Sequence, residues 1–210
     1  MNSTKIYLVR HGQTVWNVKK RMQGHQDSPL TKLGILQANW AKEALDDIKI
    51  DIIYSSPSNR AYKTAEIIKG NRKIPLVAKN NLREINLGDW EGAMIDDIHE
   101  KYPKKYNAFW RTPHLFQLEN GESYYDVQDR AIRELKGILE QHEGKTILIV
   151  THTVTLKLIM AYFENRSVSD LWDSPYIHPA SISMVEIKGK KAIIHQHGDT
   201  SHYKENIIGW

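Results

Sequence analysis

The chain alternates short apolar runs with longer segments in which apolar side chains recur at helical spacing. Apolar runs rich in β-branched residues indicate buried strands. We expect such strands over residues 6–9, 51–55, 74–78 and 146–150, and two alternating strands over 180–187 and 192–197. The remaining periodicity predicts helices over 14–20, 31–45, 93–101, 126–142 and 154–163, and a further helix that opens within 56–60 and runs to about 69. In the 31–45 segment, the apolar face is expected to include Leu33, Leu36, Trp40, Ala41, Ala44 and Leu45.

This order of strands and helices predicts an α/β fold, a three-layer sandwich with a mainly parallel central sheet and helices on both faces. Lys188-Gly189-Lys190-Lys191 separates the last two strands and favours an antiparallel hairpin at one edge. We expect one domain over 1–210, with a small inserted, cap-like helical segment at about 93–125. Part of that insert is unusually aromatic, with Tyr102, Tyr106, Phe109, Trp110, Phe116, Tyr124 and Tyr125.

Polar residues follow three of the apolar runs. Arg10 and His11 come directly after the first strand, and His152 follows the strand that ends at 150, one residue on. Arg60 lies in the first turn of the helix after the second strand, where a cation opposes the helix dipole. Because ligands bind at the carboxyl edge of open α/β sheets, we expect these side chains to meet there. Their plainer interpretation is a structural Arg-His pair and a solvated arginine.

Two guanidiniums and two imidazoles at one edge suit phosphoryl transfer. Guanidinium groups bind a tetrahedral dianion through paired donors. One imidazole can attack phosphorus while the other stabilises charge, and positioning with charge neutralisation carries most of the catalysis. Glu84 lies between apolar neighbours, which indicates partial burial; taken alone, this position favours a structural carboxylate over a catalytic one.

Composition narrows the possibilities further. The absence of cysteine excludes disulfides, thiolate metal sites and a cysteine nucleophile, and it fits a reducing cytoplasm. The net charge of +4 comes from scattered basic residues, which suits a small anionic substrate and does not require nucleic acid. Lys157 interrupts the longest apolar stretch, and no signal-like segment is expected, so we expect neither secretion nor a membrane span.

Several motifs together resemble the histidine phosphatase (phosphoglycerate mutase-like) superfamily, and within it the PhoE-type broad-specificity phosphatases. The resemblance spans nearly the whole chain. It rests on residues 8–14 with Trp16 and Asn17, Gln23-Gly24, 27–31, 55–57 with Arg60-Ala61, 64–66, 82–84, 88–92 and 150–152, and on Trp110, 113–115 and Leu171-Trp172.

The resemblance implies a metal-independent, cofactor-independent phosphatase in which His11 accepts the phosphoryl group and Glu84 donates a proton. Neutral His11 would form a phosphohistidine, and water would then release inorganic phosphate, with Glu84 as base. The implied phosphate ligands are Arg10, Asn17, Gln23, Gly24, Arg60, His152 and Thr153. Thr153 departs from the glycine usual at that position, and its β-branched side chain could crowd a phosphate beside the backbone N–H.

The expected substrates are small phosphomonoesters, with broad specificity and a preference for apolar or aryl leaving groups. Phe109, Trp110 and Phe116 are the candidate contacts, and the alternative is that they pack the core of the insert. A cofactor-dependent phosphoglycerate mutase, a phosphatase dedicated to one sugar (bis)phosphate and a non-catalytic phosphate-binding module stay open. A mutase is disfavoured because Trp90-Glu91-Gly92-Ala93 stands where mutases carry a Glu-x-x-Tyr-Gly-type stretch.

Two further motifs are set aside. Gly144-Lys145-Thr146 is similar to the end of a phosphate-binding P-loop, but a strand follows it where a P-loop needs a helix. His195 and His197 could share one strand face, yet no further ligand nearby completes a metal site.

Overall fold

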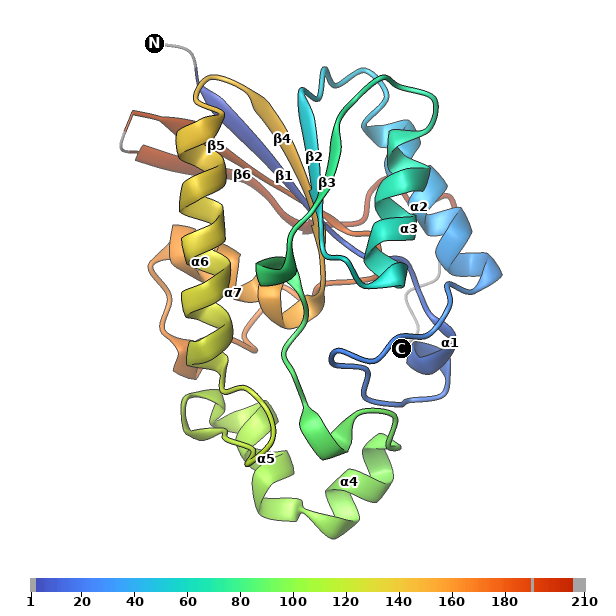
Figure 1. Cartoon of the computed structure of the whole chain (residues 1–210), viewed down its shortest axis with the longest axis vertical. Coiled ribbons are helices and arrows are strands. Elements are labelled where there is room, and N and C mark those ends of the chain that lie inside the picture. Colours follow the sequence, from blue (N-terminus) through green and yellow to red (C-terminus); the bar gives the residue numbers. More distant parts are fainter. Residues whose placement is uncertain (1–2, 190, 206–210) are drawn as a thin grey trace.

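The computed structural model describes residues 3–189 and 191–205, and it has a single six-stranded sheet between two helical layers (Figure 1). The sheet order is β3-β2-β4-β1-β5-β6. The strands are β1 (Thr4–Arg10), β2 (Ile52–Ser55), β3 (Leu76–Ala78), β4 (Thr146–Thr151), β5 (Ile182–Lys188) and β6 (Lys191–Asp199). The helices are α1 (Val15–Val18), α2 (Lys32–Ala44), α3 (Asn59–Lys69), α4 (Ile95–Lys101), α5 (Pro103–Arg111), α6 (Tyr124–Gln141) and α7 (Thr153–Glu164).

The four strands β1 to β4 are parallel, and β5 and β6 add an antiparallel hairpin. The predicted α/β class and mainly parallel sheet are therefore confirmed. The expected turn of this hairpin includes Lys190, which lies outside the described residues. In the central parallel pair, Arg10 of β1 is in register with Thr151 of β4. This register brings the residues that follow, His11 and His152, to the same edge of the sheet.

Alternation along the central strands sends side chains to two separate cores. Ile6 and Leu8 of β1 pack toward α6 and α7, whereas Tyr7 and Val9 pack toward α2 and α3. Figure 1 shows these helix pairs covering opposite faces of the sheet. Burial on both faces explains why these strands read as nearly continuous apolar runs.

The face that α2 buries differs from the expected one. Leu36 and Ala44 are exposed, and the helix turns Gly34, Gln37, Ala38, Trp40 and Ala41 inward. Gln37 is buried because its side-chain oxygen accepts a hydrogen bond from the backbone N–H of Gln13 at 2.9 Å. A tertiary contact of this kind has no signature in the helical period.

The inserted segment forms a small helical cap beyond the carboxyl ends of the strands (Figure 1). It holds α4, α5 and a 3₁₀ turn at Pro113–Leu115. Its aromatic side chains share a core with the amino-terminal part of α6 and with α7. Helix α4 starts two residues later than expected, because Met94 is extended and forms a bridge with Arg21. Among the residues that the structure describes, no helix combines the length and apolar content needed to cross a bilayer.

Two glycines allow α2 to approach the end of β1. A Cβ atom on Gly34 would lie 2.0 Å from the backbone oxygen of Gln13, and one on Gly12 would lie 2.4 Å from the backbone oxygen of Gly34. Real Cβ atoms do not come this close to backbone, so a side chain at either position must push the helix and the strand end apart. The position of His11 therefore depends on these glycines.

We predict that Gly34→Ala destabilises the fold by about 1–3 kcal/mol, the usual cost of overpacking, and lowers turnover by moving His11. Gly137→Ala is the matched control, because a Cβ there meets nothing within 4 Å. It should be neutral or stabilising by about 0.5–1 kcal/mol, because glycine is a poor helix former. Urea unfolding measures both changes, and equal effects of the two substitutions would contradict the prediction.

Candidate active site

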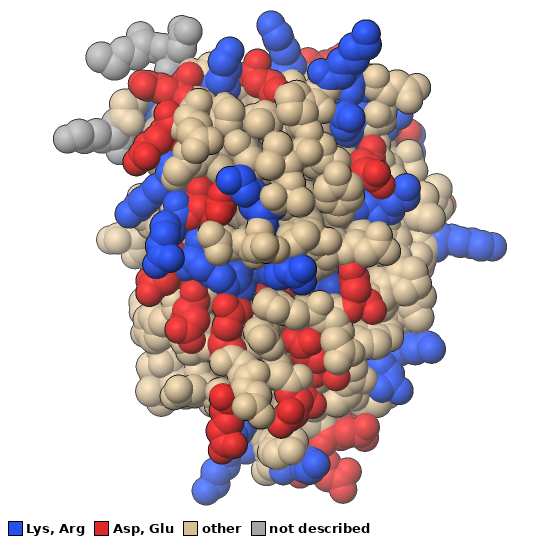
Figure 2. Space-filling view, in the orientation of Figure 1, with Lys and Arg blue, Asp and Glu red and all other residues tan. Residues whose placement is uncertain are grey.

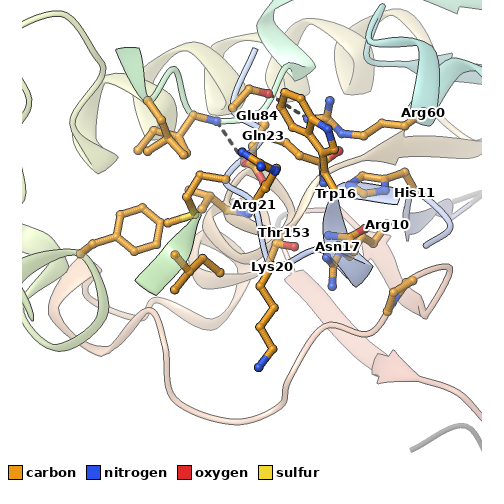
Figure 3. Close-up of a pocket in the computed structure, with 18 of the residues that line it drawn as sticks. Arg10, His11, Trp16, Asn17, Lys20, Arg21, Gln23, Arg60, Glu84 and Thr153 are labelled. Atoms are coloured by element: carbon orange, nitrogen blue, oxygen red, sulfur yellow. Dashed lines mark hydrogen bonds between the residues drawn. The ribbon is translucent and has the colours of Figure 1, made fainter. Parts of the chain in front are cut away.

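A cavity of about 630 Å³ opens at the carboxyl edge of the sheet, beneath the cap (Figure 3). It brings together eight of the residues predicted from the sequence for catalysis or phosphate binding, from four separate parts of the chain. They are Arg10, His11, Asn17, Gln23, Gly24, Arg60, Glu84 and Thr153. His152 does not line the cavity. It lies directly behind His11, fully buried, with the two ring centroids 5.2 Å apart.

The hydrogen bond of His11 fixes which of its nitrogens is free. The Nδ1 atom lies 2.8 Å from the backbone oxygen of Gly12. Because a carbonyl oxygen only accepts, Nδ1 must carry a proton there. In the neutral imidazole, the lone pair is then on Nε2, which is the tautomer that a nucleophile needs.

Both imidazoles are held in the neutral form. Burial lowers the pKa of His11 well below its usual range, and the guanidiniums of Arg60 and Arg10 lower it further, while the Gly12 carbonyl acts in the opposite direction. The pKa of His152 is likewise lowered, first by burial and then by Arg60, His11 and Arg10. The cations that would attract an anionic substrate therefore also keep the imidazoles deprotonated.

The two arginines are buried, and mainly backbone carbonyls bind them. Arg10 Nη1 donates to the oxygen of Ile177 at 2.7 Å. Arg60, which is 1% exposed, donates to the backbone oxygens of Gly24 and Gln26, both at 2.8 Å. In each guanidinium, the Nε atom is buried without a partner among the described residues. Carbonyls carry no net charge, so much of the positive charge stays available to an anion.

Asp27 is the one carboxylate that forms an ion pair with these arginines in the described part of the chain. Its Oδ1 lies 3.0 Å from Arg60 Nη1, and its side chain is partly exposed. The carboxylate raises the pKa of Arg60, opposing the larger effect of burial, which lowers it. This pair explains how a cation is tolerated in the first turn of α3, where the dipole is unfavourable.

Glu91 ties together the loop that binds Arg60 and the segment that carries Glu84. Its two carboxylate oxygens accept the backbone N–H groups of His25, Gln26 and Leu87 at 2.7–3.0 Å. The loop passes so close that a Cβ on Gly24, whose φ is +54°, would lie 2.2 Å from Glu91 Oε1. Gly24 is therefore required by both its backbone conformation and its packing.

Glu84 is held at the amino terminus of α7. Its carboxylate accepts the backbone N–H groups of Ile85 at 3.0 Å, Val154 at 3.2 Å and Thr155 at 3.3 Å. Arg130 fixes the chain around it by donating to the backbone oxygens of residues 81, 83 and 84. Glu84 thus has the structural role that its sequence position favoured, because it accepts three backbone hydrogen bonds. It also lines the cavity, where it can contact a ligand.

Asn17, Gln23 and Thr153 are the remaining predicted phosphate ligands that line the cavity. Asn17 Oδ1 accepts the backbone N–H of Thr14 at 2.9 Å in a capping box that starts α1. The Asn17 amide nitrogen, which has no bond within the described residues, is left for a ligand. Gln23 Oε1 accepts from the hydroxyl of Thr14 at 3.1 Å. Thr153 is the first residue of α7, and its side chain borders the cavity (Figure 3).

The cap supplies an apolar wall, although not with all three predicted aromatics. Phe109 and Trp110 line the cavity, with their ring centroids 4.8 Å apart. Phe116 does not; it packs inside the cap against Trp90 and Phe109, so its predicted role in the pocket is wrong. Its place in the aromatic run could not reveal this, because the direction of its ring depends on the 3₁₀ turn before it and on packing within the cap. Sequence reasoning missed the rest of the apolar lining, which is Trp16, Met22, Ile85, Leu87, Ile95, Val154, Trp172, Tyr176 and Pro179.

Two cations that sequence reasoning also missed lie on the cavity wall. Lys20 and Arg21 follow α1, and Arg21 Nη1 donates to the backbone oxygen of Gly92. In Figure 3 the Lys20 side chain extends away from His11. Lys20 adopts a φ of +51°, a left-handed conformation that is uncommon outside glycine. Such conformations cluster at functional sites and could have been a signal only once the backbone was known.

The outer surface around the site is mixed in charge. Figure 2 shows basic and acidic side chains interspersed over one face, with a short band of basic groups at mid-height.

His195 and His197 contact different carboxylates, Glu186 at 3.1 Å and Glu164 at 2.7 Å. Within the described ranges, no group of three or more potential ligands is placed to hold a metal ion. Gly144 and Lys145 lead into β4, which begins at Thr146, so a strand and not a helix follows this motif.

Comparison with known proteins assigns the family. The model of the histidine phosphatase superfamily (branch 1) matches residues 6–200. A metal-independent phosphoserine phosphatase of Arabidopsis thaliana is 32% identical over 95% of this chain and 83% of its own length. The uncharacterised phosphatase PhoE of Bacillus subtilis is 29% identical over 95% of this chain and 96% of its own.

The fold agrees with this result. The solved structure of YhfR from Bacillus stearothermophilus superposes with a TM-score of 0.93 and 45% identity, covering 95% of this chain and 98% of that one. The chain belongs to the histidine phosphatase superfamily, and it is an enzyme of the class that hydrolyses phosphomonoesters. The resemblance inferred from the motifs, including PhoE, is confirmed.

The neutral imidazoles lead to a prediction on stability. The unfolded chain takes up a proton on His11 near its ordinary pKa of about 6.5, whereas the folded protein does not. The free energy of unfolding should therefore fall as pH falls below about 6.5, approaching about 1.4 kcal/mol per pH unit for each such histidine. In His11→Gln this slope should be smaller by the contribution of one histidine, about 1.4 kcal/mol per pH unit. Urea unfolding between pH 7.5 and pH 5 measures it, and identical slopes would show that folded His11 protonates normally.

Proposed function

We propose that this enzyme hydrolyses small phosphomonoesters through a phosphohistidine on His11. The observation that carries the proposal is the bond from His11 Nδ1 to the Gly12 oxygen, at 2.8 Å, in a cavity that Arg10 and Arg60 also line. This bond leaves a lone pair on Nε2 beside two cations that attract a phosphoryl group.

In the first step, Nε2 of neutral His11 attacks phosphorus in line with the ester oxygen. The new P–N bond forms as the P–O bond to the leaving group breaks. Glu84, in its protonated form, gives its proton to the departing alkoxide.

In the second step, the ionised Glu84 takes a proton from water as the water oxygen attacks phosphorus. The P–N bond breaks, inorganic phosphate leaves, and His11 returns to the neutral tautomer with its proton on Nδ1. Proton and phosphoryl group are both balanced over the cycle. Glu84 acts first as acid and then as base, so it must stay within reach of both the leaving oxygen and the water.

Negative charge builds up on the phosphoryl oxygens in each step and needs hydrogen-bond donors. Donors without a partner in the described structure lie around the site. The Nε atoms of Arg10 and Arg60 and the Nδ1 atom of His152 are buried with no bond in the described structure. Ser56 Oγ holds the opposite ring nitrogen of His152 at 2.8 Å. We assign Arg10, Arg60 and His152 to the phosphoryl oxygens, with Asn17, Gln23 and the backbone at Gly24 and Thr153 as further ligands.

Metal independence is part of the proposal. The arginines already supply the positive charge that a divalent ion supplies in other phosphatases. The Arabidopsis relative is named as a metal-independent phosphoserine phosphatase, which supports the same conclusion. The proposed partners are a small phosphomonoester and inorganic phosphate. A cytoplasmic location remains a prediction from the absence of cysteine.

We predict that His11→Ala abolishes turnover while the chain stays folded, because no cysteine or other nucleophile can replace the imidazole. Brief mixing with a ³²P-labelled phosphomonoester in EDTA, followed by denaturation, should trap label on the wild-type chain. The adduct should be labile in acid and stable in base, as a phosphoramidate is. An acid-stable adduct would identify a different nucleophile, and activity that needs a divalent ion after EDTA would contradict the metal-independent mechanism.

The apolar wall supports broad specificity with a preference for apolar or aryl leaving groups. Trp110 and Trp172 lie with ring centroids 4.5 Å apart on the cap side of the cavity. Flat apolar walls contribute contact area while fixing few polar groups, so each small apolar group on a substrate changes its selection by about 1–3 kcal/mol. The sequence Trp90-Glu91-Gly92-Ala93 continues to favour hydrolysis over mutase chemistry.

A second candidate substrate class is favoured by Lys20 and Arg21. A phosphomonoester whose leaving group carries a carboxylate would place a further negative charge near these cations. Relatives named as phosphoserine phosphatases make phosphoserine the natural probe of this class.

We predict that the wild-type enzyme has a higher kcat/KM for an aryl phosphate than for phosphoserine. Trp110→Ala should lower that value about tenfold, equivalent to about 1.4 kcal/mol, with a smaller effect on phosphoserine. Tyr125→Ala, which removes an exposed tyrosine outside the cavity, should change neither. Lys20→Met tests the second candidate. If the enzyme prefers leaving groups that carry a carboxylate, this substitution should lower phosphoserine turnover and leave aryl phosphate turnover unchanged. An unchanged ratio in Trp110→Ala would exclude the aromatic wall as a determinant.

A further inference from the structure

A buried lysine lies behind the wall of the cavity, outside the catalytic set. Lys157 is one turn into α7 and only 4% exposed. Its Nζ atom donates to the backbone oxygens of Asp173, at 2.8 Å, and Pro175, at 3.1 Å. An ammonium group is costly to bury, and most of the buried side chains around Lys157 on α7 are apolar. The burial of Lys157 therefore requires a structural or functional explanation.

Both carbonyls belong to residues 171–179, which we call the 171–179 loop. Its side chains Trp172, Tyr176 and Pro179 line the cavity on the side of the leaving group. Trp172 reaches the cap, where its Nε1 donates to the backbone oxygen of Phe109 at 2.7 Å. The loop therefore joins the body of the enzyme to the cap across the substrate pocket.

Side-chain cations hold the backbone of this loop at several points. Beyond the two bonds of Lys157, Arg166 donates to the oxygens of Asp173 at 3.4 Å and Ser174 at 3.2 Å. Farther along the loop, Arg10, which lines the cavity beside His11, donates to the backbone oxygen of Ile177. Because the loop has little regular structure to satisfy its carbonyls, its path depends on these donors.

Resting on the proposed function of the cavity, we propose that Lys157 is a positioning residue that sets the leaving-group wall of the pocket. Its bonds to Asp173 and Pro175 place Trp172 and Tyr176, on either side of them in the chain, against the substrate. The Lys157 ammonium also lies 6.0 Å from the centre of the Trp172 ring, close enough for a cation–π contact. Binding of the leaving group should depend on Lys157, whereas binding of phosphate alone should depend on it much less.

The charge on Lys157 changes within the working range of pH. Burial, and then the charge of Arg166, lower the pKa of Lys157 to about 8, while Glu164 and Asp173 act in the opposite direction. His197 of β6 completes the charged surroundings through its contact with Glu164. Above pH 8 the amine is neutral, and its hydrogen bonds to the loop carbonyls lose the strength that charge gives them.

The test measures binding, so that it does not depend on turnover. The probes are phenylphosphonate, a non-hydrolysable aryl ligand, and inorganic phosphate, with Kd values from tryptophan fluorescence at pH 7. Lys157→Met should weaken phenylphosphonate about tenfold and phosphate less than threefold. Lys157→Arg should restore most of the difference. Lys136→Met, which removes an exposed lysine of α6, is the control and should change neither Kd.

The wild-type pH profile gives a second measurement. The Kd for phenylphosphonate should rise relative to that for phosphate as pH passes through about 8, and Lys157→Arg should flatten this rise because arginine stays charged. Equal weakening of both ligands in Lys157→Met would overturn the proposal, and so would no weakening of either. If Lys157→Met does not fold, a flat wild-type profile overturns it. Failure to hydrolyse any phosphomonoester would refute the proposed function alone, since these Kd values do not rely on catalysis.

Discussion

The structure of the site depends on the way buried and partly buried cations are satisfied by backbone carbonyls. Four cations each donate to main-chain oxygens of a segment that borders the cavity: the buried Arg10, Arg60 and Lys157, and the partly buried Arg130, which also pairs with Glu122. The accepting carbonyls belong to Gly24, Gln26, Asn81, Arg83, Glu84, Asp173, Pro175 and Ile177. A buried N–H group without an acceptor is costly, so each cation holds its loop in place.

This way of binding the cations has an electrostatic consequence. A carboxylate partner offsets a guanidinium charge, whereas a carbonyl satisfies its N–H groups and leaves most of the charge in place. Arg10 has no carboxylate partner within the described residues, and Arg60 has one, the partly exposed Asp27. Both arginines still act on the imidazole of His11, whose pKa is lowered first by burial and then by Arg60 and Arg10. The positive charge that remains is suited to a phosphate dianion. Scaffold and electrostatics are thus supplied by the same side chains.

The cap shows how far local sequence can lead and where it stops. Its aromatic composition predicted an inserted helical segment and a small core. In the structure, α4 and α5 lie beyond the carboxyl ends of the strands, and the aromatic side chains share a core with α6 and α7. The direction of individual rings was not predictable, because Phe109 and Phe116 occur in the same run, yet only Phe109 borders the cavity. Ring direction depends on the turn at 113–115 and on packing against α6 and α7. Trp172 and Tyr176 enter the cavity from a loop far away in the chain.

Sequence by itself determined the order of strands and helices, the sheet edge where His11, Arg60 and His152 collect, and the phosphoryl chemistry that they suit. These features follow from local patterns, because burial on both faces makes a strand apolar and a polar residue must then mark its end. Tertiary structure alone decided the hydrogen bonds of Glu91 to the loop at His25 and Gln26 and the burial of Lys157, and it set the ring orientation in which His11 bonds the carbonyl of the next residue. Glu91 and Lys157 bond backbone groups of segments that are distant in the chain. The sequence pattern does not reveal which backbone groups folding brings next to a side chain.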